Sequence, residues 1–145
     1  MAKKKLKDFD YKTIKTFEDA CKKENIDPNS ISLLFQLAPE FRKPTIAVYK
    51  LFIIFKAINN GWEADYTNPN QCKYFPWSCV LSSGVGFDYS YYDFGLACTA
   101  VGVRLCTNTP EKALYIAEQF ADIRADYLLY TDVWEYSKPK KFKIV

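Results

Sequence analysis

Apolar residues recur every three or four positions between residues 44 and 59, and this spacing predicts a long helix. Pro44 suits the first turn of a helix, and Asn60-Gly61 is a common signature of a helix end. The apolar positions at helical spacing are Val48, Leu51, Phe52, Phe55 and Ile58, with Ile53 and Ile54 widening the face. Because apolar residues lie on more than one side, we expect this helix to be central and buried.

A second, long amphipathic helix is predicted over about 110–130. It begins at Thr109-Pro110-Glu111, which combines an N-cap residue, a proline at the first helical position and an acid in the first turn. Its apolar stripe consists of Ala113, Ile116, Ala117, Phe120, Ile123, Tyr127 and Leu128. This stripe is expected to pack against the core.

Two shorter helical segments are predicted before the central helix. Thr16 is a suitable N-cap for a helix over 17–24, and Pro28 ends that helix because proline disfavours helical geometry in the preceding residue. A second helical or turn segment is expected over 29–38. Its side chains expected in the core are Ile31, Leu34 and Phe35.

Residues 74–106 are rich in aromatic and β-branched side chains and alternate with a period of two, which predicts three antiparallel strands joined as a meander. The strands are expected over 74–81, 85–94 and 97–107. Pro76 cannot donate to a strand ladder, so the first strand is expected at an edge, or Pro76 at its start.

The third predicted strand has two different faces. Val101, Val103 and Leu105 alternate along it and are expected to face the core. On the other face, small residues surround Arg104, which leaves room for a ligand to approach. The whole pattern predicts a single α+β domain over 1–145, with N-terminal helices, a three-stranded antiparallel β-meander and a long C-terminal amphipathic helix. The basic ends, 1–8 and 137–145, are expected to be tails.

The composition narrows the chemistry that the chain can perform. It contains no histidine, which excludes His-based acid–base catalysis, the usual Ser or Cys triads and His metal sites. The five cysteines lack C-x-x-C spacing, which argues against zinc, so we expect reduced thiols in a cytoplasmic protein. The longest apolar run, 51–55, is too short to span a membrane.

Two remaining residue patterns could still indicate an enzyme. Glu118, Asp122 and Asp126 lie four residues apart and would share one helix face, but this spacing is more typical of a solvated stripe than of a metal site. Cys106 follows Arg104, which could lower its thiol pKa, but without a histidine partner a packed thiol is expected. We therefore expect no enzyme activity, no cofactor and no metal.

Several short motifs resemble a family of small proteins found in Bacteroidales genomes and their phages, including crAss-like phages. That family shares a Y-[YF]-P-W, G-F, V-G-x-R-L-C-F and E-x-A-x-x-x-x-x-x-F layout. The matching positions here are Tyr74, Phe75, Pro76, Trp77, Gly86, Phe87, Val101, Gly102, Arg104, Leu105, Cys106, Glu111, Ala113 and Phe120. The chain departs from the layout at Val103 and Thr107. The resemblance implies a phage or mobile-element context and carries over no functional residue.

The aromatic content predicts a binding function. Aromatics make up 17% of the chain, more than one face of a small core needs, and a wet ring face beside a cation suits stacking of single-stranded bases. The predicted site residues are Arg104, Tyr89, Tyr91, Tyr92, Trp77 and Tyr74. The alternatives are that the rings pack under the helices or form an interface. In the interface case, the rings would form the contact of a homo-oligomer, of a virion accessory component or of an inhibitor of a host defence protein.

Overall fold

The fold is built around one long helix, α2. The computed structural model describes residues 8–80 and 87–129, and the side chains within these ranges except those of 78–80 and 87–92. The elements in chain order are η1 (Tyr11–Thr13), α1 (Phe17–Glu24), η2 (Pro28–Gln36), α2 (Pro39–Asn59), β1 (Lys73–Val80), β2 (Phe87–Gly95), α3 (Pro110–Gln119) and α4 (Ala121–Leu128). The described residues therefore form an α+β structure, as the sequence predicts.

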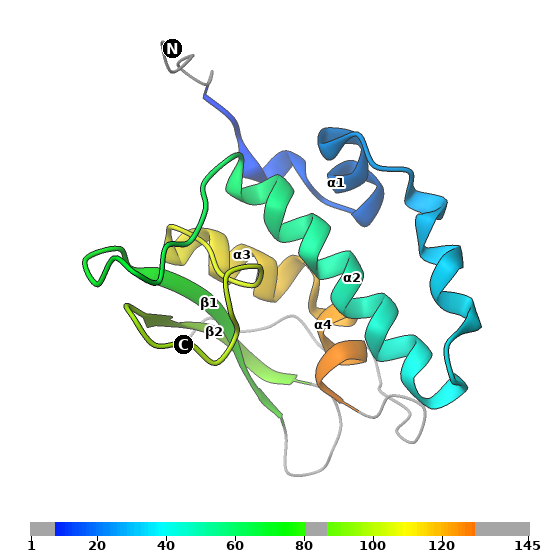
Figure 1. Ribbon diagram of the computed structural model, residues 1–145. Helices are drawn as coiled ribbons and strands as arrows, with labels where there is room; N and C mark the ends of the chain where they lie inside the picture. The colour runs from blue at the N-terminus through cyan, green and yellow to red at the C-terminus, as the bar shows by residue number, and fades with distance from the viewer. Residues whose placement is uncertain (1–7, 81–86, 130–145) are drawn as a thin grey trace.

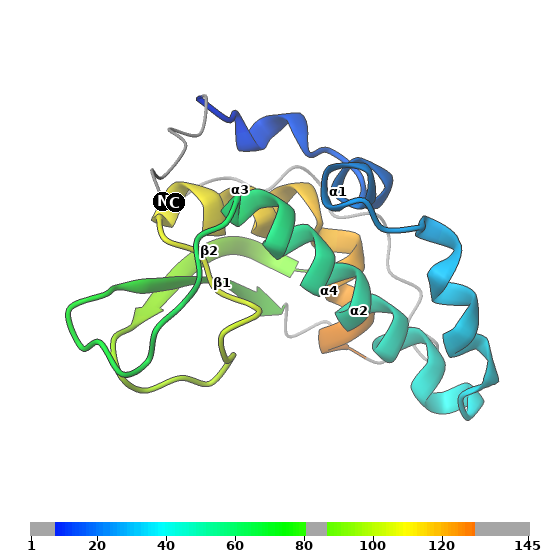
Figure 2. The same cartoon turned by 45° about the horizontal axis from the view of Figure 1, so that its top comes forward.

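Helix α2 separates the sheet from the N-terminal helical segments. In Figures 1 and 2 the two strands lie on one side of α2, and η1, α1 and η2 lie on the other. Helix α2 contacts α1, α4, η1 and η2, whereas α3 contacts both strands. The helices thus connect the sheet to the N-terminal part of the fold.

The apolar core lies where α1, α2 and α3 meet. Its buried members are Ile14, Phe17, Ala20, Cys21, Leu51, Ile53, Ile54, Phe55, Ala57, Ile58, Leu105, Ile116 and Phe120. The central, buried helix that the sequence predicts is confirmed. Among the residues expected in the core from η2 and α2, Phe35 and Phe52 are exposed instead.

The bounds of the helices follow from their capping residues. Thr16 forms a capping box with Asp19, since Thr16 Oγ1 accepts from the Asp19 amide at 3.1 Å and Asp19 Oδ2 accepts from the Thr16 amide at 3.0 Å. Helix α2 begins at Pro39, earlier than predicted, with Pro44 inside it. A proline there removes only the bond to the carbonyl of Glu40 in the first turn, so the helix continues through it.

The described sheet has two strands rather than the three predicted. β1 and β2 pair antiparallel, and Tyr74 alone forms an isolated bridge with Thr107, with N–O distances of 2.9 and 2.7 Å. The predicted third strand over 97–107 is otherwise a loop. Its backbone donors bond locally: Thr99 Oγ1 accepts from the amides of Val101 at 3.0 Å and Gly102 at 2.8 Å.

Two features explain why this loop does not extend as a strand. Gly102 has a left-handed φ of +74°, which a strand does not use. The local Thr99 bonds also occupy donors that a ladder would need. As a result Val103, expected in the core, is exposed, while Leu105 is buried.

The predicted long C-terminal helix is two helices in the structure. Phe120 adopts φ −112° and ψ 30°, which ends α3, and α4 follows directly. The change of direction allows α4 to pack against α2 while α3 packs against the strands. It also moves Tyr127 and Leu128 of the expected apolar stripe to the exposed surface and buries Arg124 instead.

Among residues 8–80 and 87–129, no helix has both the length and the apolar character needed to cross a membrane.

Candidate ligand cavity around Arg104

The structure places Tyr74 and Trp77, two of the predicted site residues, on β1. Tyr74 is half-buried, and its ring centroid lies 6.1 Å from that of Phe94. Trp77 is 50% exposed, and its ring centroid lies 6.4 Å from that of Phe75. Trp77 is therefore available for stacking, whereas the ring of Tyr74 is partly covered by neighbouring residues of the protein.

The three other predicted tyrosines are placed by the strand register. Tyr91 pairs with Trp77, Tyr89 pairs with Cys79, and Tyr92 pairs with Pro76. Successive register positions of a strand face opposite sides of the sheet. The backbone positions of Tyr89 and Tyr91 therefore lie on one face and that of Tyr92 on the other. The side chains of all three lie outside the described part of the structure.

Arg104 does not lie on the sheet. It sits in the loop that replaces the predicted third strand, where its side chain is exposed and borders a cavity of about 400 Å³. The cavity is lined by Phe52, Ile53, Lys56, Asn59, Trp62, Glu63, Ala64, Val103 and Arg104. None of the predicted sheet residues with a described side chain is among them. Tyr74 and Trp77 thus do not share this cavity with Arg104.

The end of α2 shapes one wall of this cavity. Asn60, the C-cap residue, adopts the left-handed conformation with φ 48°, and Gly61 follows with φ +87°. Two successive left-handed residues reverse the chain, and the amide of Trp62 donates to the carbonyl of Asn59 at 3.0 Å. Trp62 thereby lines the cavity together with residues of α2.

Asn59 lines the cavity and has an unpaired, buried acceptor. The residue is only 8% exposed, and its Nδ2 donates to the carbonyl of Cys106 at 2.8 Å. Because a carbonyl can only accept, this bond determines the orientation of the amide. Asn59 Oδ1 has no hydrogen-bond partner in the described part of the chain. A buried acceptor without a donor costs about 1–3 kcal/mol.

A buried lysine holds the loops behind the cavity. Lys73 is fully buried, and its Nζ donates to the carbonyls of Asn68 at 3.0 Å and Leu96 at 2.7 Å. The ammonium also lies 4.9 Å from the ring centroid of Tyr66. The Tyr66 hydroxyl in turn donates to Thr99 Oγ1 at 2.9 Å. These contacts join the segment after α2 to the loop that carries Arg104.

The charges around the cavity are mixed but favour an anion at its rim. Arg104 and Lys56 are cationic, and Glu63 is the carboxylate that lines the cavity. Lys56 Nζ lies 3.7 Å from Glu24 Oε2, with the lysine side chain 70% exposed, so this ion pair is weak. Phe52, Ile53 and Val103 supply apolar wall. The cavity is of the size and mixed character typical of small-ligand sites.

The Cys106 thiol is not activated by its neighbourhood. It is buried, and burial raises its pKa, although the Tyr66 hydroxyl at 3.9 Å and the charge of Lys73 act in the opposite direction. Cys106 is thus the packed thiol that the sequence predicts. Within the described residues, no group of three or more Cys, Asp or Glu side chains could hold a metal ion.

We expect iodoacetamide at neutral pH to modify Cys98 at least about tenfold faster than Cys106, because Cys98 is exposed and only thiolates react. Peptide mass spectrometry after timed quenching measures both rates in one sample. In urea the two cysteines should react at similar rates. Equal rates in the native protein would contradict the buried position of Cys106.

The sequence patterns missed most of the cavity. Phe52 fits the helical spacing of a core residue, and only the packing exposes it. Asn59 and Trp62 flank the Asn60-Gly61 helix end, which indicated where the chain turns but not what the turn would enclose. An aromatic residue directly after such a helix end is the signal that could have pointed to Trp62.

Comparison of the chain with protein-family models, with curated proteins and with solved structures finds no match.

Proposed function

We propose that the protein is a non-enzymatic binding protein for single-stranded nucleic acid and that it holds one nucleotide in the Arg104 cavity. The observation that carries this proposal is the unpaired acceptor Asn59 Oδ1 in a cavity lined by an indole ring and a guanidinium group. A nucleobase has a face for stacking and N–H donors on its edge, and it is attached to an anionic backbone.

Each group in the cavity has a role in this proposal. Trp62 offers the ring on which a base stacks. Asn59 Oδ1 accepts from an N–H group of the base edge. Arg104 and Lys56 contact backbone phosphates at the rim, where their charges remain hydrated and salt-sensitive. The aromatic rings that the sequence predicts on the sheet, Trp77 among them, are a separate contact surface for the same bound nucleic acid.

The family resemblance adds a setting to this proposal. It supports a phage or mobile-element context, and with it the cytoplasm of a host cell as the place of action. The resemblance brings no known activity, so the proposed binding role rests on the cavity and not on this likeness.

The test is binding of a fluorescently labelled 12-nucleotide single strand, measured by anisotropy over a series of salt concentrations. We expect Arg104→Ala to weaken binding at low salt by about 1.5–3 kcal/mol, as for the loss of a charge-assisted hydrogen bond. The slope of log K against log salt should fall by about 0.7, the value for one phosphate contact on a single strand.

Lys12→Ala is the matched control because it removes the same charge from an exposed position on η1. It should leave the salt slope almost unchanged. Equal effects of the two variants would show that the Arg104 cavity is not the site. Thermal unfolding of both variants separates loss of binding from loss of fold.

A second candidate function is supported by one observation. Leu33 is 75% exposed, and Phe35 and Phe41 are also exposed on η2 and at the start of α2. Contiguous patches of exposed apolar side chains are typical of protein interfaces, and these three residues lie on two successive elements. If the protein does not bind single-stranded nucleic acid at low salt and instead forms a stable oligomer or co-purifies with another protein, the protein-interaction role is favoured over the first proposal.

A further inference from the structure

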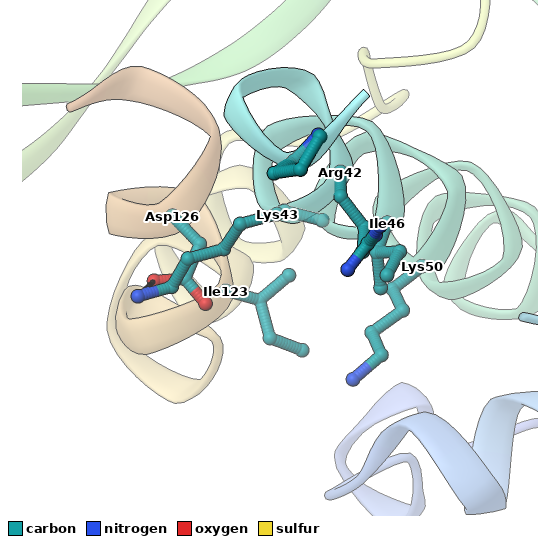
Figure 3. A pocket seen from close by; sticks show the side chains of 8 residues that line it. Arg42, Lys43, Ile46, Lys50, Ile123 and Asp126 are labelled. Atoms are coloured by element: carbon teal, nitrogen blue, oxygen red, sulfur yellow. Dashed lines mark ion pairs between the residues drawn. The ribbon is translucent and has the colours of Figure 1, made fainter. Parts of the chain in front are cut away.

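A second cavity lies between the first half of α2 and helix α4, away from the Arg104 cavity (Figure 3). Its volume is about 240 Å³. The lining residues are Pro39, Arg42, Lys43, Ile46, Ala47, Lys50, Ile123 and Asp126. None of them lines the first cavity. The second cavity is therefore a separate feature of the molecule.

Arg42 lines this cavity and has an unpaired donor. Its Nη2 donates to the carbonyl of Leu37 at 3.1 Å, which fixes the guanidinium at the start of α2. Its Nε is enclosed by protein and has no acceptor among residues 8–80 and 87–129. An oxyanion is the group that a guanidinium N–H binds most strongly, since the bond is charge-assisted.

The charges of this cavity are not balanced. Lys43 Nζ lies 3.7 Å from Asp126 Oδ1, so these two residues form an ion pair across α2 and α4. Figure 3 shows this pair on one side of the cavity and the Arg42 and Lys50 side chains on the other. Among the described residues, three cations and one carboxylate line the cavity, and their charges sum to +2.

Lys50 keeps its charge available to a ligand. Its Nζ lies 5.4 Å from the ring centroid of Phe17, a contact that uses the face of the ring and leaves the ammonium donors free to bind an oxygen. Within the described residues, neither Arg42 nor Lys50 lies within 4 Å of a carboxylate. The side of the cavity opposite the Lys43–Asp126 pair therefore carries two cations without a counter-charge.

We propose that this cavity binds a phosphate monoester in its dianionic form. Two unbalanced cations match the two negative charges of that group, and the Arg42 guanidinium, whose Nε lacks an acceptor, belongs to the cavity wall. Ile46 and Ile123 provide an apolar wall for the organic part of the ester. An internal phosphodiester, with a single charge, matches this site less well. The group could come from a small phosphorylated molecule or from the terminal phosphate of a strand.

The test is titration of the whole protein with inorganic phosphate, followed by amide chemical-shift changes at constant ionic strength set with chloride. We expect saturable shifts around residues 39–50. Arg42→Gln should weaken the affinity at least tenfold and Lys50→Gln severalfold, while Lys22→Gln, an exposed lysine on α1, should leave it unchanged. Lys50→Gln does not disturb the bond to Leu37, so it tests the charge even if Arg42→Gln unfolds the start of α2.

Two outcomes would overturn the proposal: no saturable shift in the unaltered protein, or equal affinity losses in the Lys50 and Lys22 variants. The source of the phosphate is assigned by comparing a single strand with and without a 5′-phosphate. A gain in affinity from the 5′-phosphate that Arg42→Gln abolishes indicates a strand end. Saturable binding of inorganic phosphate without that gain indicates a small phosphorylated molecule. If the protein does not bind phosphate in this cavity, the proposal of nucleotide binding in the Arg104 cavity still stands, because the two cavities share no residue.

Discussion

Replacing Lys73 by methionine is expected to lower the free energy of unfolding by about 3 kcal/mol, although the change conserves most of the side-chain volume. Lys73 is fully buried and donates to the carbonyls of Asn68 and Leu96. Methionine cannot donate, so both acceptors lose a charge-assisted bond, and each such bond contributes about 1.5–3 kcal/mol. Removing the burial cost of the ammonium offsets part of this loss.

Urea denaturation followed by circular dichroism measures the effect of Lys73→Met. The control is Lys12→Met, the same chemical change at an exposed position, which should cost less than about 0.5 kcal/mol. Hydrogen exchange adds a local readout, because the loops around Asn68 and Leu96 should open more readily in the Lys73 variant. A loss below about 0.5 kcal/mol for Lys73→Met would mean that its two bonds do not hold these loops.

Replacing Trp62 by alanine is expected to weaken single-strand binding by about 1–3 kcal/mol, the value of one base stacked on an aromatic ring. This corresponds to a loss of roughly fivefold to 150-fold in affinity. The salt slope should stay the same, because Trp62 carries no charge. Anisotropy with the same labelled strand measures both quantities.

Trp77→Ala is the control that distinguishes the cavity from the sheet. Both substitutions remove an indole ring, and Trp77 is 50% exposed on β1 at a position where the sequence predicts stacking. If Trp77→Ala weakens binding and Trp62→Ala does not, the sheet is the binding surface, as the sequence first indicated. Thermal unfolding of each variant shows whether the fold is kept, which matters because Trp62 is half-buried.

Local signals in the sequence predicted the starts of α1 and α3 and the end of α2, but not the start of α2 or the break after α3. Thr16 caps α1, Thr109 caps α3 with its Oγ1 accepting from the amide of Lys112 at 3.3 Å, and Asn60 ends α2 in the left-handed conformation. Each of these depends on residues a few positions apart, which interact in the same way in any fold. The pairing of β1 with β2 was also predicted, since adjacent segments of alternating residues form a hairpin.

The sequence-based predictions were wrong where the local sequence is compatible with two different structures. Residues 97–107 alternate well enough for a strand, but the local bonds to Thr99 and the left-handed Gly102 make a loop there. Phe120 has no proline or glycine beside it that would predict a helix break. The break is explained only by what α3 and α4 each pack against.

In the candidate site, too, the sequence predicted a residue but not its neighbours. Arg104 was predicted as an anion contact and does border a cavity, but its predicted neighbours lie on the sheet and its observed neighbours come from α2 and the segment after it. That assembly depends on Asn59 reaching Cys106, a contact across 47 positions of sequence. No periodicity encodes a contact of that range.

By itself, the sequence determined the α+β class, the central helix and the helix caps, because these follow from side-chain spacing and from bonds between near neighbours. Only the tertiary structure decided that the Arg104 segment would be a loop, that α3 and α4 would separate, and that two cationic cavities would form along α2. Those outcomes depend on which distant groups satisfy each other's hydrogen bonds and charges once the core has closed.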